Sequence, residues 1–327
     1  MQIKAKILAE CKIRTRDLRF QQMRFIIAFI AYSTILSIYG CEMDTNKSAL
    51  SEKNGLTDTL KKSSRDTLVY LPYRFTRDSI VSGLNRKVDQ NAARIIHVFV
   101  PLCDNEHQGI VPVNASLGNG MNLRTNLYWG AGYGIKTHFV RSSDWEKISS
   151  VLNPSTNVLE RVVFKHTSQN VFMVADAYRG DKMKDCLQDY FGELAGKSTD
   201  TLYLKDSTKL LSANVDLVVF NGHNGLMDTD IETIYNIDGR TKDAVAIACV
   251  SHSFYAKKLN ESGGYPLVMT SNLLAPEAYV LDNVFNAWIK NLTEEEIRFA
   301  AATGYNNVQK CGIRGASNLF VTGWGKE

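Results

Sequence analysis

Two stretches of sequence decide the fold, residues 216–225 (DLVVFNGHNG) and residues 243–252 (DAVAIACVSH). Each is a short apolar run that predicts a buried strand and leads directly into a reactive side chain. His223 follows the first run, and Cys249 ends the second. The roughly 20 residues between them satisfy the length that a parallel crossover requires. We therefore expect two neighbouring parallel strands that bring an imidazole and a thiol to the carboxyl edge of a sheet, where ligand sites of open α/β sheets lie.

Further apolar runs extend this pattern along the chain. Strands are expected at 94–102, 135–140, 161–167, 170–177, 215–220, 244–248 and 267–270, and helices at 126–133, 181–194, 253–259, 276–291 and 293–302. The last helix begins with a capping-box pattern, because Thr293 is followed three positions later by Glu296. Strands that alternate with helices predict an α/β domain with a mostly parallel sheet and helices on both faces.

The composition is that of an ordinary globular protein. The chain has 327 residues, of which 44% are hydrophobic and 22% charged, and its formal net charge is +4. About 260 residues remain without the expected targeting and linker segments, which suits one large domain at 67–327. Several of the basic residues precede residue 25, in the segment that we expect to be removed, so the mature protein is closer to neutral. No basic stripe indicates nucleic-acid binding. The six cysteines lack CxxC spacing, so no dense disulfide scaffold is predicted, and any single disulfide pairing stays open.

The amino-terminal segment has the pattern of a secretory signal. Met23 and Arg24 precede an apolar run of 16 residues, FIIAFIAYSTILSIYG, that ends at Cys41. A charged start and a short apolar core are typical of such signals, and a spanning helix needs about 20 apolar residues. Residues 1–22 are interpreted as the result of a wrongly assigned upstream start codon, and Met23 as the true initiator. An uncleaved membrane anchor is the alternative. The polar stretch at 42–66 is expected to be a solvated linker.

Residues 38–41 (IYGC) resemble the lipobox of bacterial lipoproteins. The resemblance implies that residues 1–41 contain a cleaved signal and that the thiol of Cys41 is lipidated and becomes the new first residue. Several acyl chains on one residue would give a durable tether. The protein is therefore expected to be exported and held by lipid on a membrane of the bacterial cell envelope. Which membrane, and which side of it, stays open.

The order NGHNG and then IAC resembles the signature of the caspase, legumain and gingipain group of cysteine peptidases. In that group an apolar strand ending in His-Gly precedes one ending in Ala-Cys or Ser-Cys. The run LVMTSN (267–272) and the helix after it also resemble the segment beyond the family's cysteine, so the match spans 215–290. It implies a caspase-like three-layer α/β/α sandwich. It also implies acyl transfer on a peptide or protein substrate, without a cofactor, with Cys249 as nucleophile and His223 as general base and acid.

The residues around His223 leave two functions open. Gly222, Asn224 and Gly225 are expected to form the oxyanion and substrate rim, and the two glycines permit tight backbone geometry that can expose N–H groups to a developing oxyanion. The family has glycine directly after its histidine, whereas this chain has Asn224. That departure favours the alternative, a non-catalytic caspase-like lipoprotein that uses the loops at this edge for binding or recognition.

Other residues give weaker indications. Cys249 and His252 form a possible zinc set with His223, but a fourth ligand is missing, so no metal is predicted. Residues 103–107 (CDNEH) follow the first expected strand and either shape a substrate pocket or form an ordinary polar loop. Asp176 ends another expected strand and is placed near the same edge of the sheet.

Overall fold

The computed structural model describes residues 74–198, 201–203, 209–211 and 214–324. Residues 64–327 form one compact unit, and the account below concerns its described part. The expected mis-start, signal, lipidation site at Cys41 and linker at 42–66 lie outside the described residues. Within the described part, no helix has the length and apolar character needed to cross a membrane.

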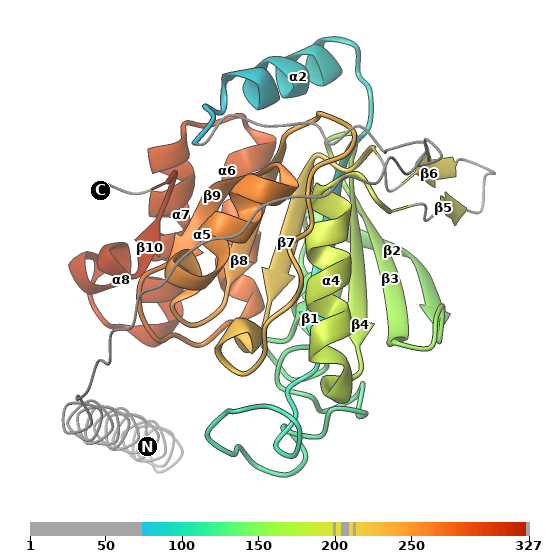
Figure 1. The fold of residues 1–327 in the computed structure, drawn as a ribbon, viewed down its shortest axis with the longest axis vertical. Helices are drawn as coiled ribbons and strands as arrows, with labels where there is room; N and C mark the ends of the chain where they lie inside the picture. The colour runs from blue at the N-terminus through green and yellow to red at the C-terminus, as the bar shows by residue number, and fades with distance from the viewer. Residues whose placement is uncertain (1–73, 199–200, 204–208, 212–213, 325–327) are drawn as a thin grey trace, which may run out of the picture. The chain divides into compact units, whose positions relative to one another are not determined.

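One eight-stranded sheet forms the centre of the unit, in the order β10-β9-β8-β7-β1-β4-β3-β2 (Figure 1). Its strands are β1 (Arg94–Pro101), β2 (Trp145–Leu152), β3 (Val158–His166), β4 (Val171–Tyr178), β7 (Leu217–Asn221), β8 (Lys242–Ile247), β9 (Gly264–Thr270) and β10 (Phe320–Val321). A separate two-stranded sheet pairs β5 (Thr201–Tyr203) with β6 (Lys209–Leu211). Every residue of β1, β4, β7, β8 and β9 is buried, which fits the continuous apolar runs of their sequences.

The sheet is mixed, so the prediction of a mostly parallel sheet is wrong, whereas the α/β class is confirmed. Strands β9, β8, β7, β1 and β4 run parallel to one another. Strands β3 and β2 at one side, and β10 at the other, pair antiparallel with their neighbours. The connections from β2 to β3 and from β3 to β4 cover only residues 153–157 and 167–170. Such short connections can join only antiparallel neighbours, because a parallel crossover needs a dozen or more residues.

Helices cover both faces of this sheet (Figure 1). They are α2 (Asp78–Asp89), α3 (Ile135–Arg141), α4 (Met183–Leu194), α5 (Ser251–Ser262), α6 (Ala278–Ile289), α7 (Glu294–Gln309) and α8 (Ile313–Leu319), with short 3-10 helices η1 (Gly180–Lys182) and η3 (Gly225–Met227). Val218 and Phe220 of β7 pack with α4 and α5, whereas Leu217 and Val219 belong to the core beneath α3, α6 and α7. This alternation is what a strand covered on both faces requires. The predicted capping box of α7 is confirmed.

Two of the predicted elements are wrong. Residues 135–140, expected as a strand, lie in helix α3, and residues 126–133, expected to begin a helix, form turns. Ile135 and Phe139 are the buried residues of α3 and lie four positions apart, which is helical spacing. Val140, the last residue of the expected strand, is 49% exposed. Helix α2 and strand β2 were not predicted at all, because most of their residues are solvent-facing.

Strand β2 forms one open edge of the large sheet. Only Trp145, at its start, is buried. Its pairing with β3 shifts register between Lys147 and Ser149, as in a β-bulge. Charged side chains, Glu146 and Lys147, lie in the first part of the strand.

A buried ionic network lies between the sheet and α4. His97 of β1 is 3.0 Å from Asp176 of β4 through its Nε2, and 3.6 Å from Glu193 of α4 through its Nδ1. Arg161 donates two hydrogen bonds of 2.7 Å to the same Asp176 carboxylate. Asp176 lies two residues before the carboxyl end of β4, near that edge of the sheet as expected, but its carboxylate is fully buried and serves this network.

Candidate functional site

Strands β7 and β8 are parallel neighbours, as expected from their sequences, and their loops are bonded to each other. Asn221 pairs with Ile247 at the ends of the two strands. Beyond that point, Gly222 N–H donates to the carbonyl of Ile247 at 3.2 Å. The Asn224 side-chain amide then donates to the carbonyl of Cys249 at 2.6 Å. The segments that carry the imidazole and the thiol are thus fixed side by side at the carboxyl edge of the sheet.

His223 is a buried imidazole with a carboxylate partner. Its ring is only 7% exposed, and its Nε2 lies 2.6 Å from Oδ2 of Asp228. Asp228 follows η3 and is partly exposed. The same Oδ2 also accepts a hydrogen bond of 2.9 Å from the backbone N–H of Gly109. An ionised carboxylate accepts only, so His223 donates through Nε2, and Nδ1 is left as the nitrogen that can accept a proton.

Cys249 is a free, half-buried thiol two residues beyond the end of β8. Burial raises the pKa of the thiol and outweighs the opposing influence of nearby backbone groups, including that of Leu274. The sulfur lies 3.6 Å from the Leu274 carbonyl, a distance at which S–H can donate. Among the described residues, no hydrogen bond joins this sulfur to the ring of His223. The thiol is therefore protonated at rest.

The turn that follows Cys249 is strained. Val250 has φ 52° and ψ 31°, in the left-handed region, and helix α5 begins at the next residue. A β-branched residue in this region is a genuine outlier, and such strain tends to be stored at functional sites. The Val250 N–H donates to the carbonyl of Asn272 in the loop after β9 at 3.1 Å, which helps to hold the turn. The strained turn fixes Cys249 between the end of a strand and the start of a helix.

The three residues predicted to shape the oxyanion site are all buried next to His223. The N–H of Gly222 and the side-chain amide of Asn224 already have protein partners, which are the two contacts to the β8 segment described above. The Asn224 Oδ1 also accepts from the N–H of Leu226, so this residue caps η3. A Cβ at Gly225 would lie 2.2 Å from Cγ of Met183, so glycine is required for the close approach to α4. An oxyanion role for these residues stays a prediction.

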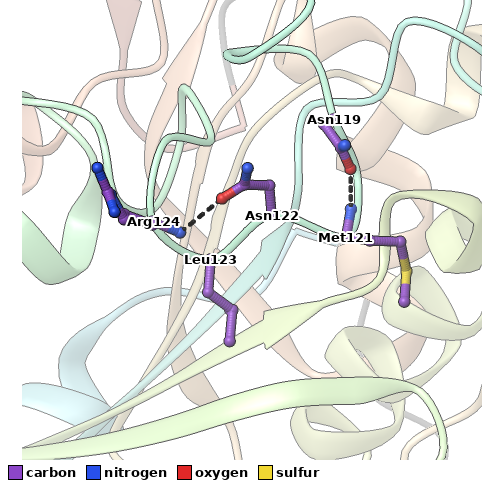
Figure 2. Close-up of a pocket in the computed structure, with 5 residues that line it drawn as sticks. All are labelled: Asn119, Met121, Asn122, Leu123 and Arg124. Atoms are coloured by element: carbon purple, nitrogen blue, oxygen red, sulfur yellow. Dashed lines mark hydrogen bonds between the residues drawn. The ribbon is translucent and has the colours of Figure 1, made fainter.

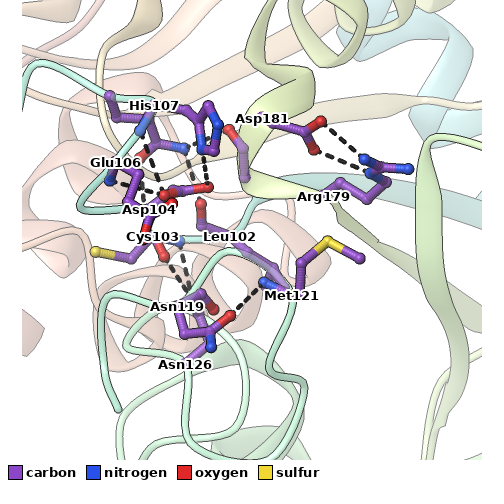
Figure 3. Close-up of polar contacts among 12 residues, drawn as sticks. Leu102, Cys103, Asp104, Glu106, His107, Asn119, Met121, Asn126, Arg179 and Asp181 are labelled. Atoms are coloured by element: carbon purple, nitrogen blue, oxygen red, sulfur yellow. Dashed lines mark hydrogen bonds and ion pairs between the residues drawn. The ribbon is translucent and has the colours of Figure 1, made fainter. Parts of the chain in front are cut away.

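Residues 103–107 lie at the same edge, as expected, in the β1–α3 loop (residues 102–134). This loop gathers beside the carboxyl ends of the strands at the bottom of Figure 1. Cys103 is buried. The Nδ1 of His107 lies 2.9 Å from Oδ2 of Asp104, and the His107 side chain is 54% exposed (Figure 3). Hydrogen bonds to Asp104 raise the pKa of His107. A second imidazole–carboxylate pair therefore lies close to the first.

The β1–α3 loop also contains an open hollow lined by Asn119 and residues 121–124 (Figure 2). The Asn119 side chain accepts from the N–H of Met121 at 2.9 Å, and the Asn122 side chain accepts from the N–H of Arg124 at the same distance. These are local turns in which asparagine side chains replace backbone acceptors. They explain the shape of this part of the loop, and they supply no convergent reactive groups.

The zinc alternative lacks support in the described part of the chain. No three histidine, cysteine, aspartate or glutamate side chains there converge in a way that could hold a metal ion. His223 is committed to Asp228, and Cys249 to the carbonyl of Leu274.

Comparison with family models, with curated proteins and with solved structures finds no match to this chain. The class of the protein therefore follows from its fold and site alone. It is an α/β protein with a mixed sheet and with Cys249, His223 and Asp228 at the carboxyl edge of that sheet.

Sequence reasoning missed Asp228 and Gly109. Asp228 lies five residues after His223, within the same loop, so a search for carboxylates near the histidine would have found it. Gly109 lies more than a hundred residues before His223, and no local pattern distinguishes it from other loop glycines.

Proposed function

We propose that the protein is a cysteine peptidase-like hydrolase that transfers the acyl group of a peptide or protein substrate to Cys249. His223 is the general base and acid, and Asp228 orients it. The observation that carries the proposal is the Nε2 contact of His223 with Asp228 at 2.6 Å, on a segment bonded to the Cys249 carbonyl. A carboxylate, an imidazole and a thiol on adjoining segments form the arrangement on which nucleophilic catalysis depends.

The reaction follows from the protonation states. The thiol proton passes to Nδ1 of His223 as the sulfur attacks the scissile carbonyl carbon, and Asp228 stabilises the resulting imidazolium. The C–N bond breaks, and the imidazolium returns the proton to the leaving nitrogen. In the second half, His223 takes a proton from water, the hydroxide attacks the thioester, and the proton goes to the departing sulfur. A thiol that is protonated at rest fits this activation by a general base.

The proposed frame is a caspase-like three-layer α/β/α sandwich. The parallel order β8-β7-β1-β4 and helices on both faces support it. In such a sheet the loops after the parallel strands share one edge, which is where a substrate would bind.

The test is labelling with a peptidyl acyloxymethyl ketone, mapped by mass spectrometry. Cys249 is expected to react, and His223→Ala is expected to slow that reaction by about 100-fold through loss of the general base. Cys311 is an exposed free thiol in the same molecule and serves as the internal control. Its rate is expected to be the same in both proteins. Equal labelling of Cys249 in the two proteins contradicts the proposal.

A second candidate function is binding without catalysis. Burial raises the pKa of the Cys249 thiol, and the Asn224 side chain is used to hold the Cys249 carbonyl. Both observations favour a site whose chemistry has been lost while its loops remain ordered for recognition. Under this function Cys249 reacts no faster than Cys311, whether or not His223 is present.

We further propose that the protein is a lipoprotein of the bacterial cell envelope, tethered through Cys41. The short apolar run that ends at IYGC supports this. Bacteria that express the full chain and are fed radiolabelled palmitate are expected to incorporate label into the protein. Cys41→Ala is expected to abolish the incorporation, with Cys311→Ala as the control that keeps it. Label that persists in Cys41→Ala rules the tether out.

A further inference from the structure

We propose that Gly109 is a positioning residue of the site, which holds the Asp228 carboxylate against His223. This inference rests on the proposed function and assigns a role in it to the β1–α3 loop. Three features of the described residues carry it. They are the hydrogen bond from Gly109, the missing side chain of Gly109, and the bracing of the short segment that precedes it.

The hydrogen bond comes first. The Gly109 N–H donates to Oδ2 of Asp228 at 2.9 Å, and this is the oxygen that faces Nε2 of His223 at 2.6 Å. Asp228 lies on a partly exposed turn after η3. Its carboxylate can rotate unless both contacts hold it. The N–H group from a different strand's loop therefore fixes the oxygen that orients the imidazole.

The missing side chain is the second feature. A Cβ at position 109 would lie 2.3 Å from Oδ1 of Asp228 and 3.0 Å from its Cγ. Gly109 does not have a positive φ, so alanine fits the backbone without strain. The group that would have to move is the carboxylate itself. A side chain at position 109 would therefore displace the Asp228 carboxylate from its place against His223.

The third feature is the bracing of residues 104–108. The Asp104 carboxylate accepts the N–H of Glu106 at 2.9 Å and contacts Nδ1 of His107 (Figure 3). The buried Gln108 amide donates to the carbonyls of Leu102 and Gly180, at 2.8 and 3.1 Å.

A Cβ at Gly120 or Gly180 would come within 2.6 Å of the Asp104 side chain, so the loop is closely packed around it. Gly109 therefore follows a segment tied to the ends of both β1 and β4.

The test is Gly109→Ala, with Gly132→Ala as the matched control. Gly132 is an exposed glycine of the same loop, and no atom lies within 4 Å of the Cβ it would gain. Gly109→Ala is expected to slow peptidyl ketone labelling of Cys249 by about 10- to 100-fold, because a displacement of about 1 Å at a catalytic group has effects of this size. Labelling of Cys311 in both variants, and of Cys249 in Gly132→Ala, is expected to stay unchanged.

A double-variant cycle tests the route of the effect. If Gly109 acts through Asp228, then Gly109→Ala combined with Asp228→Asn is expected to label no more slowly than Asp228→Asn alone. Additive losses overturn the proposal. If Gly109→Ala does not fold, Asp104→Ala replaces it in this cycle, because it releases the bracing segment instead.

Proton NMR of the ring nitrogens gives a readout that does not need hydrolysis. The Nε2 proton of His223 is expected to give a slowly exchanging downfield resonance because of its short bond to Asp228. Gly109→Ala is expected to remove this resonance, and Gly132→Ala to retain it. A retained resonance in Gly109→Ala overturns the role of Gly109. Should Cys249 fail to label in the unmodified protein, the hydrolase proposal falls, and the resonance alone decides the role of Gly109.

Discussion

Asp228→Asn is expected to label Cys249 about 100-fold more slowly than the unmodified protein, an effect of the kind caused by a wrong imidazole tautomer. The asparagine is nearly isosteric, so the loop keeps its shape. Its amide can present an N–H to Nε2 of His223, which then becomes the accepting nitrogen. Nδ1 would carry the proton and could no longer accept one from the thiol of Cys249.

The control is Asp230→Asn. Asp230 lies two residues further along the same loop and pairs with Lys258 at 2.8 Å, and its side chain is 87% exposed. Such a surface pair contributes little, so this variant is expected to label at the normal rate. Labelling rates are measured at several probe concentrations, so that loss of reactivity is separated from loss of binding. A normal rate for Asp228→Asn would show that Asp228 does not orient His223.

The second large effect concerns stability and pH. Burial alone would lower the pKa of His97, but the contacts with Asp176 and Glu193 outweigh it and raise the pKa to about 9. A pKa that is higher in the folded state gives stability that is fully present below the unfolded value of 6.5. That stability is lost as the pH rises through about 9. A rise from 6.5 to about 9 corresponds to about 3 kcal/mol, so the free energy of unfolding is expected to fall by this amount between pH 6.5 and pH 9.5.

Urea unfolding in the presence of a reductant, at pH 6.5 and pH 9.5, measures this difference. His97→Gln removes the titrating group and is expected to abolish most of the difference. His138→Gln is the control, since His138 also lies 3.0 Å from a carboxylate, that of Asp282, but in a partly exposed pair. It is expected to keep the difference shown by the unmodified protein. If the unmodified protein is equally stable at both pH values, His97 is not held as a cation.

At the acid end the same network acts in the opposite direction. Burial would raise the pKa of Asp176, but Arg161 and His97 together lower it to about 2. Its stabilisation is present above the unfolded value near 4 and is lost as the pH falls through about 2. The two shifts describe one shared contact, so they are not added. The network is therefore at full strength between about pH 4 and pH 6.5.

The inner strands could be predicted from sequence because burial on both faces leaves a continuous apolar run. The runs that became β1, β7 and β8 are of this kind, and they bring His223 and Cys249 to one edge. Strand β2 could not be predicted, since an edge strand exposes most of its side chains and shows little apolar pattern. Residues 135–140 were misassigned because in a short apolar run the strand and helix patterns overlap.

The residues of the site that follow strand ends could be predicted from the sequence. Those that are brought together by contacts between loops could not. Cys249 and His223 are found from position alone. The partnership of Gly109 with Asp228 depends on a long-range contact between loops, which no spacing in the sequence encodes. The ionic partners of Asp176 were hidden for a similar reason, because His97 and Arg161 come from two other strands.

The open side of β2 bears on how copies of the protein behave when they are crowded together. An exposed strand offers unpaired backbone groups to which a strand of another molecule can add. Here the register shift after Lys147 breaks the regular spacing of those groups, and two charged side chains would have to be stripped of water on contact. The edge is thereby a poor template for growth into fibres. When many copies are crowded together, we therefore expect them not to associate through β2.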